Sequence, residues 1–234
     1  MARTRFVAAL LVAAALTVSQ GTSAVAADFE HPTVIELFQS QGCSSCPPAN
    51  ANLNAIAGRS DVLALSFAVT YWDQLGWKDI FAQPAFTQRQ WDYAKSAGRG
   101  NVSTPQMIVN GRGVMVGNRS DQVIAFARRY DRGATGPAIV GSAGRVSIGM
   151  AAAKPAIVWL VRYDPRVLNV PIRAGENGGR TLPHRNIVRS LQTLGRWRGA
   201  AISFAVPPSP NRAYRSAVLV QQGSGGPIIA ARTL

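Results

Sequence analysis

Hydrophobic and polar positions in the first half of the chain form short apolar runs that alternate with segments of helical spacing. Two apolar or β-branched runs are predicted to be strands: 33–38 and 61–70. Three segments with apolar residues at helical spacing are predicted to be helices: 47–57, 84–97 and 121–130. A hairpin with a type I′ turn at Asn110 and Gly111 is predicted for 106–117. The predicted order of elements is therefore β-α-β-α-β-β-α.

The second half of the chain has a different pattern, with short strand-like runs separated by Gly- and Pro-rich turns. Six runs are predicted to be strands: 145–148, 156–163, 167–172, 200–206, 214–221 and 227–231. The segment 185–194 is predicted to be a further strand or a short helix. We therefore expect two domains, residues 28–132 and a mostly-β domain of residues 133–234, the second a small β-sandwich packed on the first.

Residues 1–27 are typical of a secretory signal peptide. Arg3 and Arg5 precede an apolar run over 6–18, and small residues follow it, so that cleavage is expected after Ala26 or Ala27. The alternative is a retained anchor, but the run is shorter than the roughly 20 residues that cross a bilayer. We expect a periplasmic or secreted protein without stable membrane insertion after cleavage.

Charge divides the chain in the same way as the hydrophobic pattern. Residues 28–130 hold 9 Lys and Arg against 8 Asp and Glu, whereas residues 131–234 hold 14 against 3, within a formal net charge of +14. Such a field attracts anionic partners. Because arginine outnumbers lysine 22 to 3 and no basic block of five occurs, the alternative is a bias of composition. Nucleic acid is not expected as a partner.

The two cysteines, Cys43 and Cys46, form a CxxC between the first predicted strand and the first predicted helix. As the chain has no others, a larger disulfide framework and a four-thiolate zinc site are excluded, and Pro47 in place of histidine excludes haem attachment. A helix N-terminus stabilises a thiolate, so Cys43 is expected to be the exposed attacking thiol and Cys46 the resolving one. The alternative is a static structural disulfide.

Element order and the position of the CxxC resemble those of thioredoxin-like proteins. The segments IELFQSQGCSSCPPAN, YWDQLGWKD, STPQM and RTLPHRNIV also resemble the secreted thioredoxin-like proteins of the domain-of-unknown-function family 1223. The resemblance implies an α/β thioredoxin-like fold with an appended mostly-β C-terminal domain. The family name implies no substrate, and no cofactor is expected.

The same resemblance gives expected roles to three residues. Pro105 is expected to be a cis-proline that faces the disulfide, with the backbone of Thr104 pairing with an extended substrate peptide. Glu36 stands in an apolar strand seven residues before Cys43, and is expected to accept the proton of Cys46. The alternative is an exposed or hydrogen-bonded Glu36 without a catalytic role.

The loop that follows the second strand carries aromatic and acidic side chains at the edge of the sheet where the CxxC is expected. Its candidate substrate-binding residues are Tyr71, Trp72, Asp73 and Trp77. They are expected to form a substrate-binding wall or to adjust the acidity of the cysteines. The alternative is that the tryptophans only seal the core beneath the loop.

These features predict an exported thiol–disulfide oxidoreductase that acts on protein thiols or disulfides of the cell envelope together with an unidentified redox partner. The alternatives are a Cu(I) chaperone that uses the two thiolates with Met107 or Met115, or a non-catalytic binding module. The two histidines, His31 and His184, are too few for a metal cluster and are expected at the surface or as caps.

Overall fold

The computed structural model describes Met1 and residues 26–234. The predicted signal peptide lies almost entirely outside the described residues. Within them, no helix has both the length and the apolar character needed to cross a membrane.

Three helices and thirteen strands make up the described part of the chain. The elements of the first half are β1 (Thr33–Gln39), α1 (Pro47–Ile56), β2 (Val62–Ala68), α2 (Pro84–Ser96), β3 (Gln106–Val109), β4 (Gly113–Met115) and α3 (Ser120–Arg129). The elements of the second half are β5 (Ile139–Ser142), β6 (Arg145–Ile148), β7 (Ala156–Asp164), β8 (Leu168–Pro171), β9 (Thr181–His184), β10 (Ile187–Trp197), β11 (Ile202–Ala205), β12 (Arg215–Gln221) and β13 (Ile228–Thr233).

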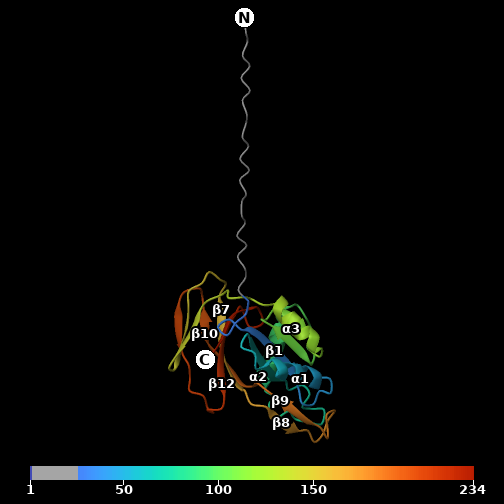
Figure 1. Ribbon diagram of the computed structural model, residues 1–234. Coiled ribbons are helices and arrows are strands. Elements are labelled where there is room, and N and C mark those ends of the chain that lie inside the picture. Colours follow the sequence, from blue (N-terminus) through green and yellow to red (C-terminus); the bar gives the residue numbers. More distant parts are fainter. Residues whose placement is uncertain (2–25) are drawn as a thin grey trace.

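Eight of the strands form one mixed sheet in the order β13-β12-β7-β10-β2-β1-β3-β4. Figure 1 labels β1, β7, β10 and β12 among them. Strand β1 runs parallel to β2 and antiparallel to β3, and β3 forms a hairpin with β4. Asn110 and Gly111 both have positive φ in the turn of this hairpin, as the Asn-Gly pair predicts. A Cβ on Gly111 would lie 2.3 Å from the carbonyl oxygen of Gly226, so the position also requires glycine for space.

The structure differs from the separate C-terminal sandwich that the sequence suggests. Strand β10 lies parallel to β2, with Ile187 opposite Ser66, so that β7, β12 and β13 extend the sheet of the first half. Only β5, β6 and β11 form a second sheet, and β8 pairs with β9 in a small hairpin. The strand pattern of the second half is compatible with either arrangement because apolar alternation does not identify the neighbouring strand.

Different helices cover the two faces of the sheet in the first half of the chain. Helices α1 and α3 cover the face that carries Ile35 and Leu37 of β1. Helix α2 covers the opposite face, where Val34 and Phe38 of β1 join side chains of β7, β10, β12 and β13 in one core. Residues from both halves therefore share a hydrophobic core, and the boundary near residue 133 does not divide the protein into independently packed units.

A buried ion pair lies inside that shared core. The carboxylate of Glu36 accepts a hydrogen bond from Nε of Arg89 at 2.7 Å and another from the hydroxyl of Tyr93, and all three residues are at most 3% exposed. Arg89 also donates to Gln221 of β12 at 3.2 Å. Burial raises the pKa of Tyr93, so its hydroxyl stays protonated and donates. The network connects β1, α2 and β12.

Removing one member of this pair is expected to destabilise the protein strongly. Arg89→Met leaves the Glu36 carboxylate buried without its cation, which is expected to lower the free energy of unfolding by about 3–5 kcal/mol. The double replacement Glu36→Leu/Arg89→Met leaves no unpaired charge and is expected to recover most of that loss.

Urea unfolding measures the free energy of unfolding of both variants. Arg119→Ala, which breaks an exposed pair with Asp121, is the control and is expected to change nothing measurable. An Arg89→Met effect as small as this control would contradict the assignment.

Candidate functional site

The two cysteines lie in the connection between the end of β1 and the start of α1. Cys46 is the N-cap residue of α1, and its sulfur is bonded to that of Cys43, with the two Cα atoms 5.4 Å apart. The connection turns back on itself because the N–H of Cys46 donates to the carbonyl oxygen of Cys43 at 3.2 Å. Strand, turn and helix thus hold the sulfurs at the carboxyl-end edge of β1.

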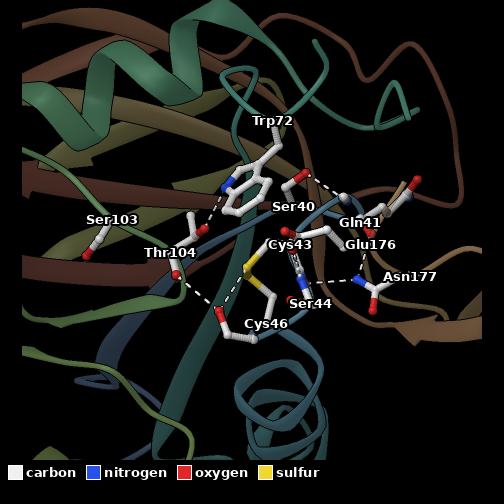
Figure 2. Close-up of a disulfide and its surroundings, with 12 residues drawn as sticks. Ser40, Gln41, Cys43, Ser44, Cys46, Trp72, Ser103, Thr104, Glu176 and Asn177 are labelled. Carbon is white, nitrogen blue, oxygen red and sulfur yellow. Dashed lines mark hydrogen bonds between the residues drawn. A yellow bond between two sulfur atoms is a disulfide. The ribbon is translucent and has the colours of Figure 1, made fainter. Parts of the chain in front are cut away.

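The exposed Cys43 that the sequence predicts is not found. Cys43 is 0% and Cys46 is 1% exposed, although Ser44 and Ser45 between them are exposed. Trp72 packs against Gly42, and its indole N–H donates to the hydroxyl of Thr104 at 2.7 Å (Figure 2). The aromatic ring and the segment before β3 therefore close one side of the disulfide.

A second part of the cover comes from the loop between β8 and β9, in the other half of the chain. The carboxylate of Glu176 accepts a hydrogen bond from the backbone N–H of Ser44 at 2.9 Å (Figure 2). The side-chain amide of Asn177 donates to the carbonyl oxygens of Gln41 and Cys43, both at 2.9 Å. These contacts satisfy backbone groups that no helix or strand partner reaches.

Sequence reasoning missed Glu176 and Asn177. One signal was present, because Glu176 is the only acidic residue after Asp164 in a strongly basic half. An isolated acid in such a segment favours a specific contact over a solvated surface position.

The hydrogen-bond donors at the start of α1 differ from the expected arrangement. Pro47 and Pro48 occupy the first two helical positions and have no N–H, so they cannot donate to a thiolate. The N–H of Ser44 is bound by Glu176. The hydroxyl of Ser45 lies 3.3 Å from the sulfur of Cys43, and because a disulfide sulfur has no proton, Ser45 is the donor in this contact; its one proton is shared with the carbonyl oxygen of Thr104.

The peptide bond between Thr104 and Pro105 is cis, in agreement with the prediction. The carbonyl oxygen of Thr104 lies 3.5 Å from the hydroxyl of Ser45, so the segment before β3 reaches the connection that holds the cysteines. Thr104 is partly exposed, whereas Pro105 is buried.

The aromatic loop borders the same site, and its residues divide between several contacts. The indole N–H of Trp77 donates to the side-chain oxygen of Gln41 at 2.9 Å, while Tyr71 donates to Gln90 of α2 at 3.2 Å. Asp73 accepts from a backbone N–H inside the loop at 3.1 Å. Trp72 and Trp77 therefore touch the cysteine connection, whereas Tyr71 and Asp73 hold the loop in shape.

Glu36 does not serve as the expected proton acceptor for Cys46. Its side chain lies on the α2 face of the sheet with Val34 and Phe38, whereas α1, which begins at Cys46, packs on the opposite face. Its oxygens are bound by Arg89 and Tyr93. The expectation was wrong because successive side chains of a strand point to opposite faces, and spacing from Cys43 does not specify the face.

Two buried titratable groups lie near the site, and neither was predicted as a site residue. Asp79, at the end of the aromatic loop, accepts the N–H of Gln41 at 2.8 Å, and burial raises its pKa to about 6. His184 of β9 lies 3.2 Å from the amide nitrogen of Asn50 on α1, and burial lowers its pKa to about 4. His184 is 1% exposed, so its expected surface position was wrong.

No group of three or more metal-ligating side chains from His, Cys, Asp and Glu occurs in residues 26–234. Met107 is fully buried in the core under α1 and α3, opposite Met115 in the register of the β3–β4 hairpin. Its sulfur lies against Gly117. Both methionines pack in that core.

Asp79 and His184 are expected to give opposite contributions to stability between pH 4 and pH 7. The pKa of Asp79 rises on folding from 3.8 to about 6, so its contribution is present below pH 4 and is lost as the pH rises through about 6. The pKa of His184 falls on folding from 6.5 to about 4, so its contribution is present above pH 6.5 and is lost as the pH falls to about 4.

The two effects are separated by single replacements. On acidification, the free energy of unfolding of Asp79→Asn is expected to fall more steeply than that of the wild type, and that of His184→Gln less steeply. Each slope is expected to differ from the wild-type slope by up to about 1.4 kcal/mol per pH unit. Urea unfolding at intervals between pH 4 and pH 7 measures these slopes. Parallel curves for both variants and the wild type would contradict the assignment.

Replacements at Ser45 and Glu176 are expected to change the reactivity of reduced Cys43 in opposite directions. Ser45→Ala removes the hydroxyl donor and is expected to slow alkylation by iodoacetamide at pH 6 by about threefold to tenfold. Glu176→Gln removes a negative charge bound at Ser44 and is expected to accelerate it by a similar factor. Glu30→Gln, at a distant ion pair with Arg232, is the matched control. Equal rates for Ser45→Ala and the wild type would contradict the contact.

Comparisons with other proteins place the chain in a family. The family model described as "Protein of unknown function (DUF1223)" matches residues 34–221. Protein AGR_C_4864 from Agrobacterium tumefaciens has a similar crystal structure, with 32% sequence identity, a TM-score of 0.72, and coverage of 89% of this chain and 94% of that one. HBP35 of Porphyromonas gingivalis is similar in fold at 12% identity, with a TM-score of 0.55 and coverage of 89% and 76%. No curated protein matches. The chain belongs to the DUF1223 family.

Proposed function

We propose that this protein is an exported, thioredoxin-like thiol–disulfide oxidoreductase that exchanges disulfides with protein substrates through Cys43 and Cys46. The observation that carries the proposal is the Cys43–Cys46 disulfide between β1 and α1, with the Ser45 hydroxyl 3.3 Å from the Cys43 sulfur and 3.5 Å from the carbonyl oxygen of Thr104. The pair closes a loop of only two intervening residues, which constrains the unfolded chain little. A redox role is a stronger reason for such a bridge than stability.

Three features of the first half support the thioredoxin-like part of this proposal. Elements β1 to α3 follow the order β-α-β-α-β-β-α. Strands β1 and β2 are parallel, and β3 and β4 add antiparallel strands on the other side of β1. The cis bond before Pro105 comes immediately before β3. Together they bring the proline segment and the cysteine connection to the same edge of the sheet.

The exchange proceeds in two balanced steps. The thiolate of Cys43 attacks a sulfur of a substrate disulfide, so that a mixed disulfide forms and one substrate sulfur leaves as a thiolate that takes up a proton. The thiolate of Cys46 then attacks the Cys43 sulfur and releases the second substrate thiol. The substrate gains two electrons and two protons, and the CxxC becomes a disulfide. In the reverse direction the protein oxidises a substrate dithiol.

Access to the sulfurs requires the cover to move. Because Cys43 is 0% exposed, a substrate sulfur reaches it only when part of this cover shifts, either Trp72 with the Thr104 segment or the Glu176–Asn177 loop. The exposed turn and the partly exposed Thr104 and Trp72 then provide the surface on which an extended substrate segment binds.

Export is part of the proposal because of the segment at the start of the chain. Residues 1–27 have the basic start, the short apolar run and the small residues of a secretory signal peptide. An oxidising compartment outside the cytoplasm keeps disulfides and supplies protein thiols and disulfides as substrates. A periplasmic or secreted location is therefore proposed together with the activity.

Trapping tests the proposed activity. Cys46→Ser keeps the attacking thiol but removes the resolving one, so it is expected to accumulate mixed disulfides with envelope proteins through Cys43. These adducts are expected to disappear on reduction and to be absent in Cys43→Ser, the matched control. Non-reducing electrophoresis and mass spectrometry of the purified variants measure them.

Two outcomes would overturn the oxidoreductase assignment. The first is an absence of adducts in Cys46→Ser together with tight Cu(I) binding by the reduced wild type, which is the behaviour of a copper chaperone. The second is a Cys43–Cys46 bridge in the wild type that exchanges with neither glutathione nor a dithiol, which is the behaviour of a static disulfide.

A further inference from the structure

A cavity of about 580 Å³ lies at the edge of the eight-stranded sheet opposite the cysteines. Strands β1, β2, β10 and β12 begin at this edge and β7 and β13 end there, as their pairing directions require. The cysteines follow the other end of β1. The cavity is therefore a feature separate from the proposed redox site, and its volume is within the roughly 300–1,000 Å³ of small-molecule sites.

Four arginines from four different segments line this cavity: Arg59, Arg166, Arg185 and Arg215. Among the described residues, no aspartate or glutamate lines it. Guanidinium groups repel each other unless acids balance their charge, so those arginines of the cluster that have no acidic partner favour an anion in the cavity. Three of the four belong to the second half, whose excess of positive charge has no part in the cysteine chemistry.

The ion pairs of these arginines indicate the charge of the missing partner. Arg59 binds Asp61 through two hydrogen bonds of 2.9 and 2.7 Å, and Arg166 binds Asp164 through two of 2.9 and 2.6 Å. The side chain of Arg185 has only a 3.4 Å contact to a backbone carbonyl oxygen, and the guanidinium of Arg215 has no hydrogen bond or ion pair with any described residue. Two positive charges in the cavity wall therefore lack a counter-charge.

The remaining wall is mixed: Ser60, Asn186 and Thr233 are polar, and other parts are apolar or aromatic. Phe29 lies at the rim and is 62% exposed, while Val62, Leu63 and Tyr163 form buried parts of the wall. An exposed phenylalanine beside a cluster of guanidinium groups favours a ligand that has an apolar part as well as negative charge.

We propose that this cavity binds a small organic phosphate, namely a phosphate monoester with two negative charges attached to an apolar or aromatic group. A phosphate monoester carries about −1.5 to −2 at pH 7, which matches the two arginines that have no acidic partner. Its terminal oxygens point in several directions and accept hydrogen bonds from guanidinium groups that approach from different segments. A single carboxylate has one charge and accepts such bonds in one plane. The apolar group of the ligand packs against Phe29.

Calorimetric titration of the whole mature chain with phenyl phosphate at low salt tests the proposal. One molecule is expected to bind per chain, and Arg185→Gln and Arg215→Gln are each expected to weaken binding by about tenfold or more. Arg198→Gln removes the same charge from an exposed position away from the cavity and is the matched control, with unchanged affinity.

Binding of phenyl phosphate is expected to weaken as sodium chloride is added. Reduction of Cys43 and Cys46 is expected to leave the affinity unchanged, which separates this site from the proposed redox activity.

Several results would overturn the proposal. One is the absence of saturable binding of phenyl phosphate to the wild type, and another is an equal loss of affinity in Arg198→Gln and Arg215→Gln. If inorganic phosphate bound as tightly as phenyl phosphate, the proposed apolar part of the ligand would be wrong. Benzylmalonate is a dicarboxylate of the same charge. If it bound more tightly than phenyl phosphate, the proposed preference for a phosphate group would be wrong. The exposed position of Arg215 makes its variant informative even if Arg185→Gln fails to fold.

Discussion

The pairing of β10 with β2 is the contact on which the arrangement of the whole protein depends. The backbone N–H of Ser66 donates to the carbonyl oxygen of Asn186 at 3.0 Å, and the side chain of Asn186 donates to the carbonyl oxygen of Ala64 at 2.8 Å. These bonds join the second half of the chain to the sheet of the first. As a result the β8–β9 hairpin lies beside α1 and brings its loop to the cysteines (Figure 1). The arginine-lined cavity forms at the opposite edge from the ends of the same strands.

The cysteine site is consequently built by both halves. The first half supplies the cysteines, Trp72 and Thr104, while the second supplies Glu176 and Asn177. Two prolines remove the first helical N–H groups of α1, and Glu176 binds the N–H of Ser44. Fewer donors are left for a thiolate than in a helix without these features, and the Ser45 hydroxyl becomes more important. The electrostatic character of the pair is thus set by contacts that the CxxC motif does not contain.

Buried charge shows the same dependence on tertiary packing. Glu36 and Arg89 form an ion pair in the shared core, with Gln221 of the second half as a further partner. A carboxylate inside an apolar strand is costly to bury alone, and its presence indicates a partner but not which one. The pairing with Arg89 depends on α2 crossing the face of β1 that carries Glu36, and this assigns Glu36 to stability instead of proton transfer.

Much of the local structure could be predicted from the sequence. The strand before the cysteines, the helix after them, the Asn110–Gly111 turn and the cis bond at Pro105 all follow from residue types over a few positions, or from the resemblance they carry. The face of Glu36, the burial of Cys43 and the contacts of Glu176, Asn177 and His184 could not be predicted in this way. Each depends on a residue more than 50 positions away in the chain.

The sequence by itself determined the CxxC, the order of the elements around it and the uneven distribution of charge, because backbone propensity, turn chemistry and composition act over short distances. Only the tertiary structure decided that both halves share a sheet, that the disulfide is covered and that arginines from four segments line one cavity. The physical reason is that a strand's apolar pattern specifies which side is buried, but the choice of neighbouring strand depends on packing of the complete chain.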